Sequence, residues 1–131
     1  MDELVIEAKL ENIEAVQDFI SARLAGCPPK VRNKIGIAVD EIFANIARYA
    51  YHPLVGVATV RIFVGDTITI EFEDSGVTYN PLEADDPDIT LAAKERQIGG
   101  LGIFLVKNLM DSVEYRRDGC KNILLIKSGL D

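Results

Sequence analysis

The sequence predicts an α+β domain, a two-layer α/β sandwich in which helices cover one face of a mainly antiparallel mixed sheet. Two observations predict this class, together with one principle of packing. Alternating apolar segments come in pairs joined by short turns, which is typical of antiparallel hairpins. Segments with apolar residues at helical spacing precede each pair. Packing helices on one face of a sheet buries the apolar side of both kinds of element.

Composition indicates a globular chain and excludes several kinds of partner. The chain has 131 residues, so we expect a single domain over residues 1–131. Hydrophobic residues make up 48% of the chain, which is enough for one sizeable core. Charged residues make up 27%, which is typical of a chain that is neither disordered nor membrane-like. The net charge of −7 argues against direct binding of nucleic acid or of an anionic membrane, because both favour a basic surface.

Cysteine and histidine usage argues against a structural zinc site and an oxidising compartment. Cys27 and Cys120 form no CxxC pair, and His52 is the only histidine of the sequence. The first ten residues lack the basic start and apolar run of a signal peptide, and no segment approaches the length of a membrane span. We therefore expect a cytoplasmic protein without a membrane partner.

Two helices are expected in the first half of the chain. A strand over residues 4–10 precedes them, and Asn12 is expected to cap the first helix. Glycine and proline at positions 26–29 separate this helix from a second one over residues 30–50. The apolar stripes that predict the two helices are Ile13, Val16, Ile20 and Leu24, followed by Ile35, Ala38, Val39, Ile42 and Ile46.

The second half predicts two hairpins separated by a long loop and a buried helix. The loop over residues 74–100 is unusually long for a compact domain, and such loops are often functional. One helical turn is expected within it at residues 91–95. The helix over residues 101–110 is apolar almost all round. The first hairpin is expected to join strands at 57–64 and 67–73 through a turn at Gly65-Asp66. The second is expected to join strands at 112–117 and 122–127 through a turn at Asp118-Gly119.

The first candidate motif places a carboxylate and a carboxamide on one helical face. Glu41 and Asn45 lie four residues apart in the expected helix over residues 30–50. Their oxygen atoms suit Mg²⁺, which keeps several waters and takes phosphate oxygens as further ligands. Taken alone, this pair is more often the solvated polar face of an ordinary helix.

The second candidate motif follows a strand, at Asp74, Ser75 and Gly76. An aspartate at a strand end can accept a hydrogen bond from the exocyclic amine of a base. Glycine two residues later allows a ligand ring to approach the backbone. An ordinary exit from strand to turn uses the same residue types, so this motif is also weak alone.

The third candidate motif is the glycine-rich entry to the helix over residues 101–110, formed by Gly99, Gly100 and Gly102. Free N–H groups and the dipole at a helix N-terminus attract phosphate. A helix packed so closely against its neighbours that only glycine fits would show the same glycines in the sequence. The motif is neither a Walker A loop, which needs a following Lys-Ser or Lys-Thr, nor a dinucleotide-binding fingerprint, which follows a strand directly.

The order and separation of the three motifs are specific where each motif alone is weak. The chain resembles the GHKL ATPases, whose architecture is the Bergerat fold. The segments DSGVTYNP and GGLGIFLVKNLMD are similar to those of the anti-sigma-factor serine/threonine kinases within that superfamily. The resemblance covers nearly the whole chain. Departures are Thr78 where the superfamily has a further glycine, and Tyr49-Ala50 where a sporulation-type relative has His-Gly.

The resemblance implies a role for each motif residue. Glu41 would act on the attacking hydroxyl, and Asn45 would hold the Mg²⁺ that bridges the phosphates of ATP. Asp74 would bind the adenine amine, with Gly76 beside it. The resemblance further implies that the segment 82–98 folds over the nucleotide as a lid. The remaining ATP-binding candidates are Gly100 and Gly102 around the phosphates, Gly99 as a lid hinge and Arg96 as a lid cation.

The implied function is that of an anti-sigma factor with kinase activity. It would transfer the γ-phosphoryl group of ATP to a serine or threonine of a STAS-domain anti-anti-sigma protein, and it would sequester a sigma factor. Members of the family often dimerise, so a homodimer is compatible with the resemblance. The sequence does not decide the oligomeric state.

Three alternatives stay open at the level of sequence. A catalytically silent ATP-binding module could control a protein partner through its lid alone. The catalytic domain of a histidine kinase is disfavoured, because no dimerisation helix with a phosphorylatable histidine precedes the motifs. An α+β scaffold without a ligand would share the fold but would gain no thermal stability from ATP and Mg²⁺.

Overall fold

A five-stranded sheet forms the back layer of the protein, whose structure is a computed structural model that describes residues 2–51, 54–78, 80–83 and 100–130. The strand order is β1-β2-β3-β5-β4. Each neighbouring pair of strands is antiparallel, so the expected mixed character is absent from the described sheet. The strands are β1 (Asp2–Glu7), β2 (Val57–Val64), β3 (Ile68–Asp74), β4 (Ser112–Asp118) and β5 (Lys121–Ser128).

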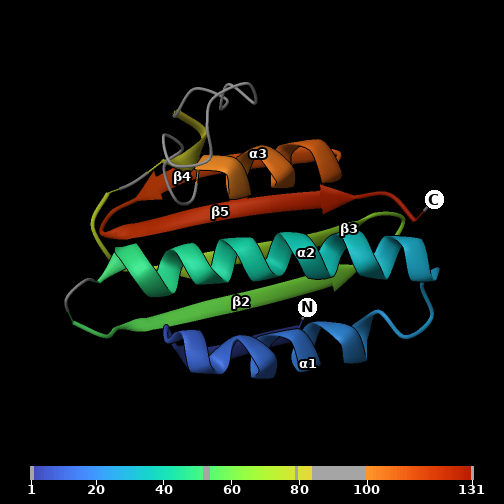
Figure 1. Cartoon of the computed structure of the whole chain (residues 1–131), viewed down its shortest axis with the longest axis horizontal. Helices are drawn as coiled ribbons and strands as arrows, with labels where there is room; N and C mark the ends of the chain where they lie inside the picture. The colour runs from blue at the N-terminus through green and yellow to red at the C-terminus, as the bar shows by residue number, and fades with distance from the viewer. Residues whose placement is uncertain (1, 52–53, 79, 84–99, 131) are drawn as a thin grey trace.

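Three α-helices of the described residues form the other layer, and Figure 1 shows all of them on the same face of the sheet. They are α1 (Ile13–Arg23), α2 (Pro29–Asn45) and α3 (Gly100–Leu109). In the figure α2 lies between α1 and α3. The described part of the chain also has short helical segments, which are η1 (Leu10–Asn12), the π-helix η2 (Ile46–Ala50) and η3 (Pro81–Glu83). The predicted two-layer α+β fold is confirmed.

The core lies between the two layers and follows the predicted stripes. Val16, Ile20 and Leu24 of the first stripe are buried, and so is every member of the second. Alternate residues of β2 and β3 complete the core from the sheet, because successive strand side chains point to opposite faces. The buried strand residues on this face include Ala58, Val60, Ile62, Ile68, Ile70 and Phe72.

Several local expectations are wrong in detail. The first strand begins at Asp2 and ends at Glu7, rather than spanning 4–10. Asn12 makes no capping bond; its Nδ2 atom donates to the carbonyl of Glu7, 2.9 Å away, and so joins the strand end to α1. The helix expected over residues 30–50 changes from α to π geometry after Asn45.

Turns and the last helix also differ from expectation. The last hairpin turns at Gly119-Cys120, where a φ of 61° at Gly119 fits a glycine in the first central position. Helix α3 is less buried than its composition predicts, because the side chain of Leu105 is 40% exposed. The helical turn expected at residues 91–95 lies outside the described residues.

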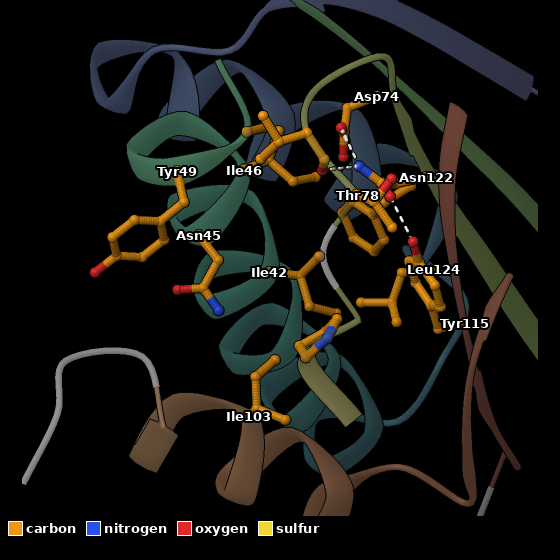
Figure 2. Close-up of a pocket in the computed structure, with 14 residues that line it drawn as sticks. Ile42, Asn45, Ile46, Tyr49, Asp74, Thr78, Ile103, Tyr115, Asn122 and Leu124 are labelled. Carbon is orange, nitrogen blue, oxygen red and sulfur yellow. Dashed lines mark hydrogen bonds between the residues drawn. The ribbon is translucent and has the colours of Figure 1, made fainter. Parts of the chain in front are cut away.

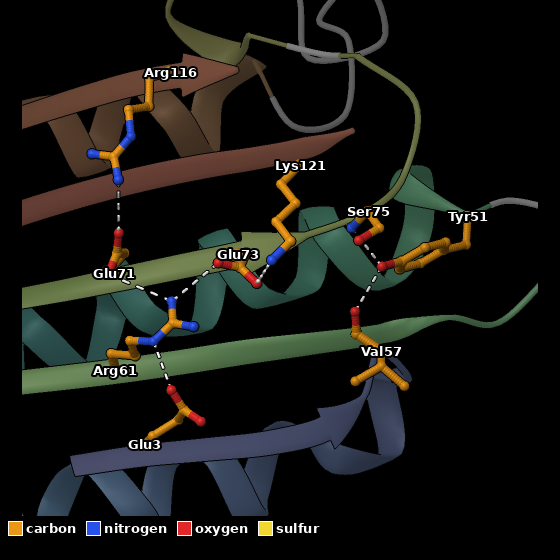
Figure 3. Close-up of polar contacts among 9 residues, drawn as sticks. All are labelled: Glu3, Tyr51, Val57, Arg61, Glu71, Glu73, Ser75, Arg116 and Lys121. Carbon is orange, nitrogen blue, oxygen red and sulfur yellow. Dashed lines mark hydrogen bonds and ion pairs between the residues drawn. The ribbon is translucent and has the colours of Figure 1, made fainter. Parts of the chain in front are cut away.

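The opposite face of the sheet carries charged side chains rather than helices. Arg61 of β2 bridges Glu3 of β1 and Glu73 of β3, with N–O distances of 2.7 and 3.2 Å (Figure 3). Burial lowers the pKa of the Arg61 guanidinium, but its hydrogen bonds to these two carboxylates raise the pKa more, and the net shift is upward. Lys121 and Arg116 extend the network at distances of 3.5 Å.

No helix within the described ranges is both long and apolar enough to cross a lipid bilayer.

Removing an apolar side chain from the helix-covered face of β3 should destabilise the protein far more than a change on its charged face. We expect Ile70→Ala to lower the free energy of unfolding by about 2–5 kcal/mol, because Ile70 is buried in the core. Thr69→Ala on the other face is the matched control and should cost about 1 kcal/mol or less. Urea denaturation measures both, and equal losses would contradict the assignment of the two faces.

Candidate functional site

A cavity of about 390 Å³ opens where η2, the end of α2 and α3 meet the sheet (Figure 2). Its walls are mainly apolar, with a small number of polar groups, which is the usual composition of a small-molecule pocket. The apolar lining comes from Ile42, Ile46, Ala50, Phe72, Val77, Pro81, Ile103 and Leu124. The polar lining comes from Asn45, Tyr49, Asp74, Thr78, Tyr115 and Asn122.

Asp74 is a buried carboxylate on the wall of this pocket, with 7% of its surface exposed. It ends β3, and its side chain points to the helix-covered face because it continues the alternation of Ile70 and Phe72. Its Oδ1 atom accepts two hydrogen bonds of 2.9 Å, from the Gly76 N–H and from Asn122 Nδ2. Both hydrogen bonds that Asp74 makes within the described part of the chain end on Oδ1, so Oδ2 is left for a donor in the pocket.

Asn122 and Tyr115 belong to this site, and sequence reasoning missed both of them. Asn122 pairs with Asp74 across β3 and β5, which brings the two side chains together. Its Oδ1 atom accepts hydrogen bonds from Tyr115 Oη at 2.5 Å and from Arg117 Nη1 at 3.1 Å. Its Nδ2 atom also donates to the carbonyl of Val77 at 2.8 Å. The strand register was the signal for these contacts, and it is not visible in a single sequence.

These contacts allow only one orientation of the Asn122 amide. A flipped amide would point its oxygen at the Asp74 carboxylate and the Val77 carbonyl, which are both acceptors. It would also point its NH₂ group at Arg117, which can only donate. The amide therefore donates to Asp74 and fixes the direction of that carboxylate (Figure 2).

Gly76 is required by a close approach between its turn and η2. A Cβ atom at position 76 would overlap the carbonyl oxygen of Ala50 and would lie 2.7 Å from the Ala50 Cβ. The same carbonyl accepts a hydrogen bond of 3.0 Å from the Val77 N–H. The second motif is thus packed against the π-helix that follows the first motif.

The first and third motifs also touch. A Cβ atom at position 102 would overlap Oε2 of Glu41 and would lie 3.1 Å from its Cδ. Glu41 therefore places its carboxylate against the first turn of α3, where free N–H groups and the helix dipole favour negative charge. Ile103, the next residue of α3, lines the pocket, so this contact adjoins the cavity.

Asn45 lines the pocket one helical turn after Glu41, at the junction of α2 and η2 (Figure 2). Its side chain is partly buried. Gly100 begins α3. Gly99, Arg96 and the expected lid from residue 84 onward lie outside the described residues, so their predicted roles stay predictions. The structure thus brings together Glu41, Asn45, Asp74, Gly76 and Gly102.

Comparison with known families agrees with this geometry. A family model described as the histidine kinase-like ATPase domain matches residues 6–127. The chain belongs to this ATPase family. Membership implies that the domain binds ATP, and it confirms the GHKL resemblance predicted from the three motifs.

Curated relatives of this ATPase domain include kinases and anti-sigma factors. The serine/threonine-protein kinase BtrW of Bordetella bronchiseptica is 31% identical over 123 residues, covering 88% of this chain and 78% of that protein. The anti-sigma F factor of Caldanaerobacter subterraneus is 27% identical, covering 95% and 90%. The serine-protein kinase RsbW of Bacillus mycoides is 28% identical, covering 95% and 82%. These relatives support a kinase or anti-sigma role.

Solved histidine kinases share the fold of this ATPase domain. The histidine kinase domain of the blue-light activated kinase of Erythrobacter litoralis EL346 matches with a TM-score of 0.52 and 22% identity, over 79% of this chain. This chain spans 46% of the length of that structure. The histidine kinase AdeS of Acinetobacter baumannii matches with a TM-score of 0.50 and 16% identity, over 100% of this chain and 68% of that structure.

Removing the amide that orients Asp74 should destabilise the protein. Asn122→Ala leaves a buried carboxylate with one donor fewer, and we expect the free energy of unfolding to fall by about 1–3 kcal/mol. Asn108→Ala is the matched control, because Asn108 is exposed and, among the described residues, its side chain bonds the carbonyl of Phe104 one turn away. It should change stability by about 0.5 kcal/mol or less in the same urea titration. Equal stability of the two variants would contradict the role of Asn122.

Proposed function

We propose that the protein is an ATP-dependent serine/threonine protein kinase and anti-sigma factor. Its substrate would be a STAS-domain anti-anti-sigma protein, and its other partner a sigma factor, which it sequesters in the cytoplasm. One observation carries the proposal. Three motifs that are far apart in the sequence meet at a single pocket, with Asp74 and Asn45 on its wall and Glu41 against Gly102 beside it.

The pocket has the chemistry that an adenine ring requires. Ile42, Ile103 and Leu124 offer apolar surface for the faces of a flat base. Asp74 offers an acceptor for the exocyclic amine at Oδ2, because its Oδ1 already receives two donors. A base with a carbonyl at the same position would bring an acceptor against the carboxylate, so the arrangement favours adenine over guanine.

The helix α3 supports binding of the phosphate groups. Its first turn begins at Gly100 and offers free N–H groups together with the positive end of the helix dipole. The absence of a side chain at Gly102 keeps this turn open, and any larger residue would meet the Glu41 carboxylate. Backbone donors at α3 would then hold the phosphates while Asp74 holds the base.

Asn45 fits the metal that accompanies ATP. Its amide oxygen is a hard ligand of the kind Mg²⁺ prefers, and the remaining ligands would be phosphate oxygens and water. The described residues hold no cluster of three or more acidic, histidine or cysteine side chains that could bind a metal without the nucleotide. When bound, Mg²⁺ supplies charge neutralisation on the phosphate oxygens.

Glu41 would act on the substrate hydroxyl. The serine oxygen forms a bond to the γ-phosphorus as the bond from that phosphorus to the β–γ bridging oxygen breaks. The hydroxyl proton passes to the Glu41 carboxylate, and ADP leaves with the electron pair of the broken bond. Catalysis of this kind consists mostly of positioning and charge stabilisation, which the groups around the pocket would supply.

The names of the relatives support the protein partners. Two of the relatives are called serine- or serine/threonine-protein kinases, and one is called an anti-sigma F factor. The net charge of −7 is compatible with protein partners and disfavours direct contact with nucleic acid. A homodimer remains compatible with this function.

Isosteric substitutions of neighbouring carboxylates on α2 separate catalysis from binding. Glu41→Gln should reduce phosphoryl transfer to the STAS protein by about 10²–10⁴, the usual contribution of a positioned base, and leave ATP affinity within about threefold. Asp40→Asn is the matched control, because Asp40 is exposed on the same helix one residue earlier, and it should retain activity. Asn45→Ala should lose both affinity and transfer.

The measurements are transfer of the labelled γ-phosphoryl group and ATP binding by calorimetry, with sigma-factor capture as a second readout. Glu41→Gln should still capture the sigma factor while failing to phosphorylate the STAS protein. Transfer at the wild-type rate by Glu41→Gln would show that Glu41 is not the base. If the wild type binds ATP but phosphorylates no serine or threonine, the protein is a catalytically silent ATP-binding module.

A further inference from the structure

The Tyr51 hydroxyl lies at the end of η2 and joins two segments of the sheet. Its Oη atom donates to the carbonyl of Val57, 2.6 Å away at the start of β2. It accepts a hydrogen bond of 2.7 Å from the Ser75 N–H, in the turn that follows Asp74. Figure 3 shows both contacts on one hydroxyl. Tyr51 does not line the pocket itself, so any influence on the ligand passes through its neighbours.

The tyrosine ring is held so that the hydroxyl has little freedom. A Cβ atom at Gly56 would overlap the ring carbons of Tyr51, so the ring packs against the Gly56 backbone in space that only glycine leaves free. The carbonyl of Tyr51 accepts a hydrogen bond of 2.7 Å from the Leu54 N–H, which closes the backbone around it. The hydroxyl therefore occupies a fixed point between β2 and the Ser75 amide.

The same segment holds the turn after Asp74 at a second point. The carbonyl of Ala50, which precedes Tyr51, accepts the Val77 N–H at 3.0 Å. Between these two anchors the Gly76 N–H donates to Asp74 Oδ1 at 2.9 Å. The N–H groups of Ser75 and Val77 thus bond to Tyr51 and Ala50 at the end of η2. The Gly76 N–H between them bonds to the Asp74 carboxylate.

We propose that Tyr51 is a positioning residue for recognition of the base. The inference rests on the proposed function, in which Asp74 accepts a hydrogen bond from the amine of ATP. The peptide between Asp74 and Ser75 carries the N–H that Tyr51 holds. A displacement of the turn would carry the following Gly76 N–H away from Asp74 Oδ1 and change the direction of Oδ2. The bond from the Ser75 N–H to the Tyr51 hydroxyl opposes this displacement.

Tyr51 also connects the two ends of the nucleotide site. Asn45 ends α2, the π-helix spans the next five residues, and Tyr51 follows it. One continuous segment therefore carries both Asn45, which is assigned to the metal, and the two groups that anchor the turn after Asp74. These groups are the Ala50 carbonyl and the Tyr51 hydroxyl. The spacing between these two sites is set by this segment, with Tyr51 as its last contact.

Tyr51→Phe tests the proposal because it removes the hydroxyl and keeps the ring on Gly56. The probes are ATP and purine riboside triphosphate, which lacks the amino group, each with Mg²⁺ in a calorimetric titration. We expect about tenfold weaker binding of ATP and little change for the analogue, since loss of one well-placed hydrogen bond corresponds to about this factor. The preference for ATP over the analogue should fall accordingly.

Ser128→Ala is the matched control. It removes a hydroxyl of the buried residue Ser128, which bonds the carbonyl of Gly129 at 3.0 Å, at the end of β5 opposite to Asn122. We expect it to keep the wild-type preference even if it lowers stability. A second readout is the hydrogen exchange of the Ser75 amide by NMR, which should become faster in Tyr51→Phe and stay slow in Ser128→Ala.

The outcomes separate this inference from the proposed function. If Tyr51→Phe keeps the wild-type preference for ATP, or weakens both nucleotides equally, Tyr51 is only a structural contact and the inference fails while the proposed function stands. If the wild type binds both nucleotides equally, the role of Asp74 in base recognition fails, and this inference fails with it. If the wild type binds neither nucleotide, the proposed function is overturned as well.

Discussion

The buried carboxylate of Asp74 is the constraint on which the rest of the pocket depends. An ionised carboxylate removed from water is strongly destabilising unless hydrogen-bond donors surround it. The protein supplies two such donors, the Gly76 N–H from the turn and Asn122 Nδ2 from the neighbouring strand, and both bond to Asp74 Oδ1. Tyr115 and Arg117 donate in turn to Asn122 Oδ1 and so hold the amide in place. Because both donors to Asp74 converge on one oxygen, the carboxylate remains able to accept a further hydrogen bond from the pocket.

The change from α to π geometry after Asn45 complements this arrangement. A π-helix is rare and occurs mostly as a single turn within an α-helix, frequently at a functional site. Here it carries the chain from the pocket wall at Asn45 to the Ala50 carbonyl, which accepts the Val77 N–H, and to Tyr51. The close approach of this segment explains the glycines at positions 56 and 76, since a side chain at either would overlap it.

Local patterns predict most of the fold and part of the site. Apolar stripes identified α1 and α2, and turn residues between alternating segments identified both hairpins. The spacing of Glu41, Asn45, Asp74 and Gly102 identified residues that the structure does bring around one pocket. Asn122 and Tyr115 could not be found in this way, because their importance follows from the pairing of β5 with β3 on one side and with β4 on the other. The π-helix was missed for a related reason: its residues have the same apolar spacing as a regular helix, and tertiary contacts decide its geometry.

The most direct test of the central claim is to locate the bound nucleotide by NMR. The protein is labelled on its isoleucine and leucine methyl groups and saturated with a non-hydrolysable ATP analogue and Mg²⁺. Intermolecular nuclear Overhauser effects from the adenine protons should appear at Ile42, Ile103 and Leu124, which line the cavity beside Asp74. Methyl groups elsewhere, such as those of Ile20 on the buried side of α1, should show none. Effects confined to methyl groups outside the cavity, or no binding at all, would contradict the assignment of this pocket to ATP.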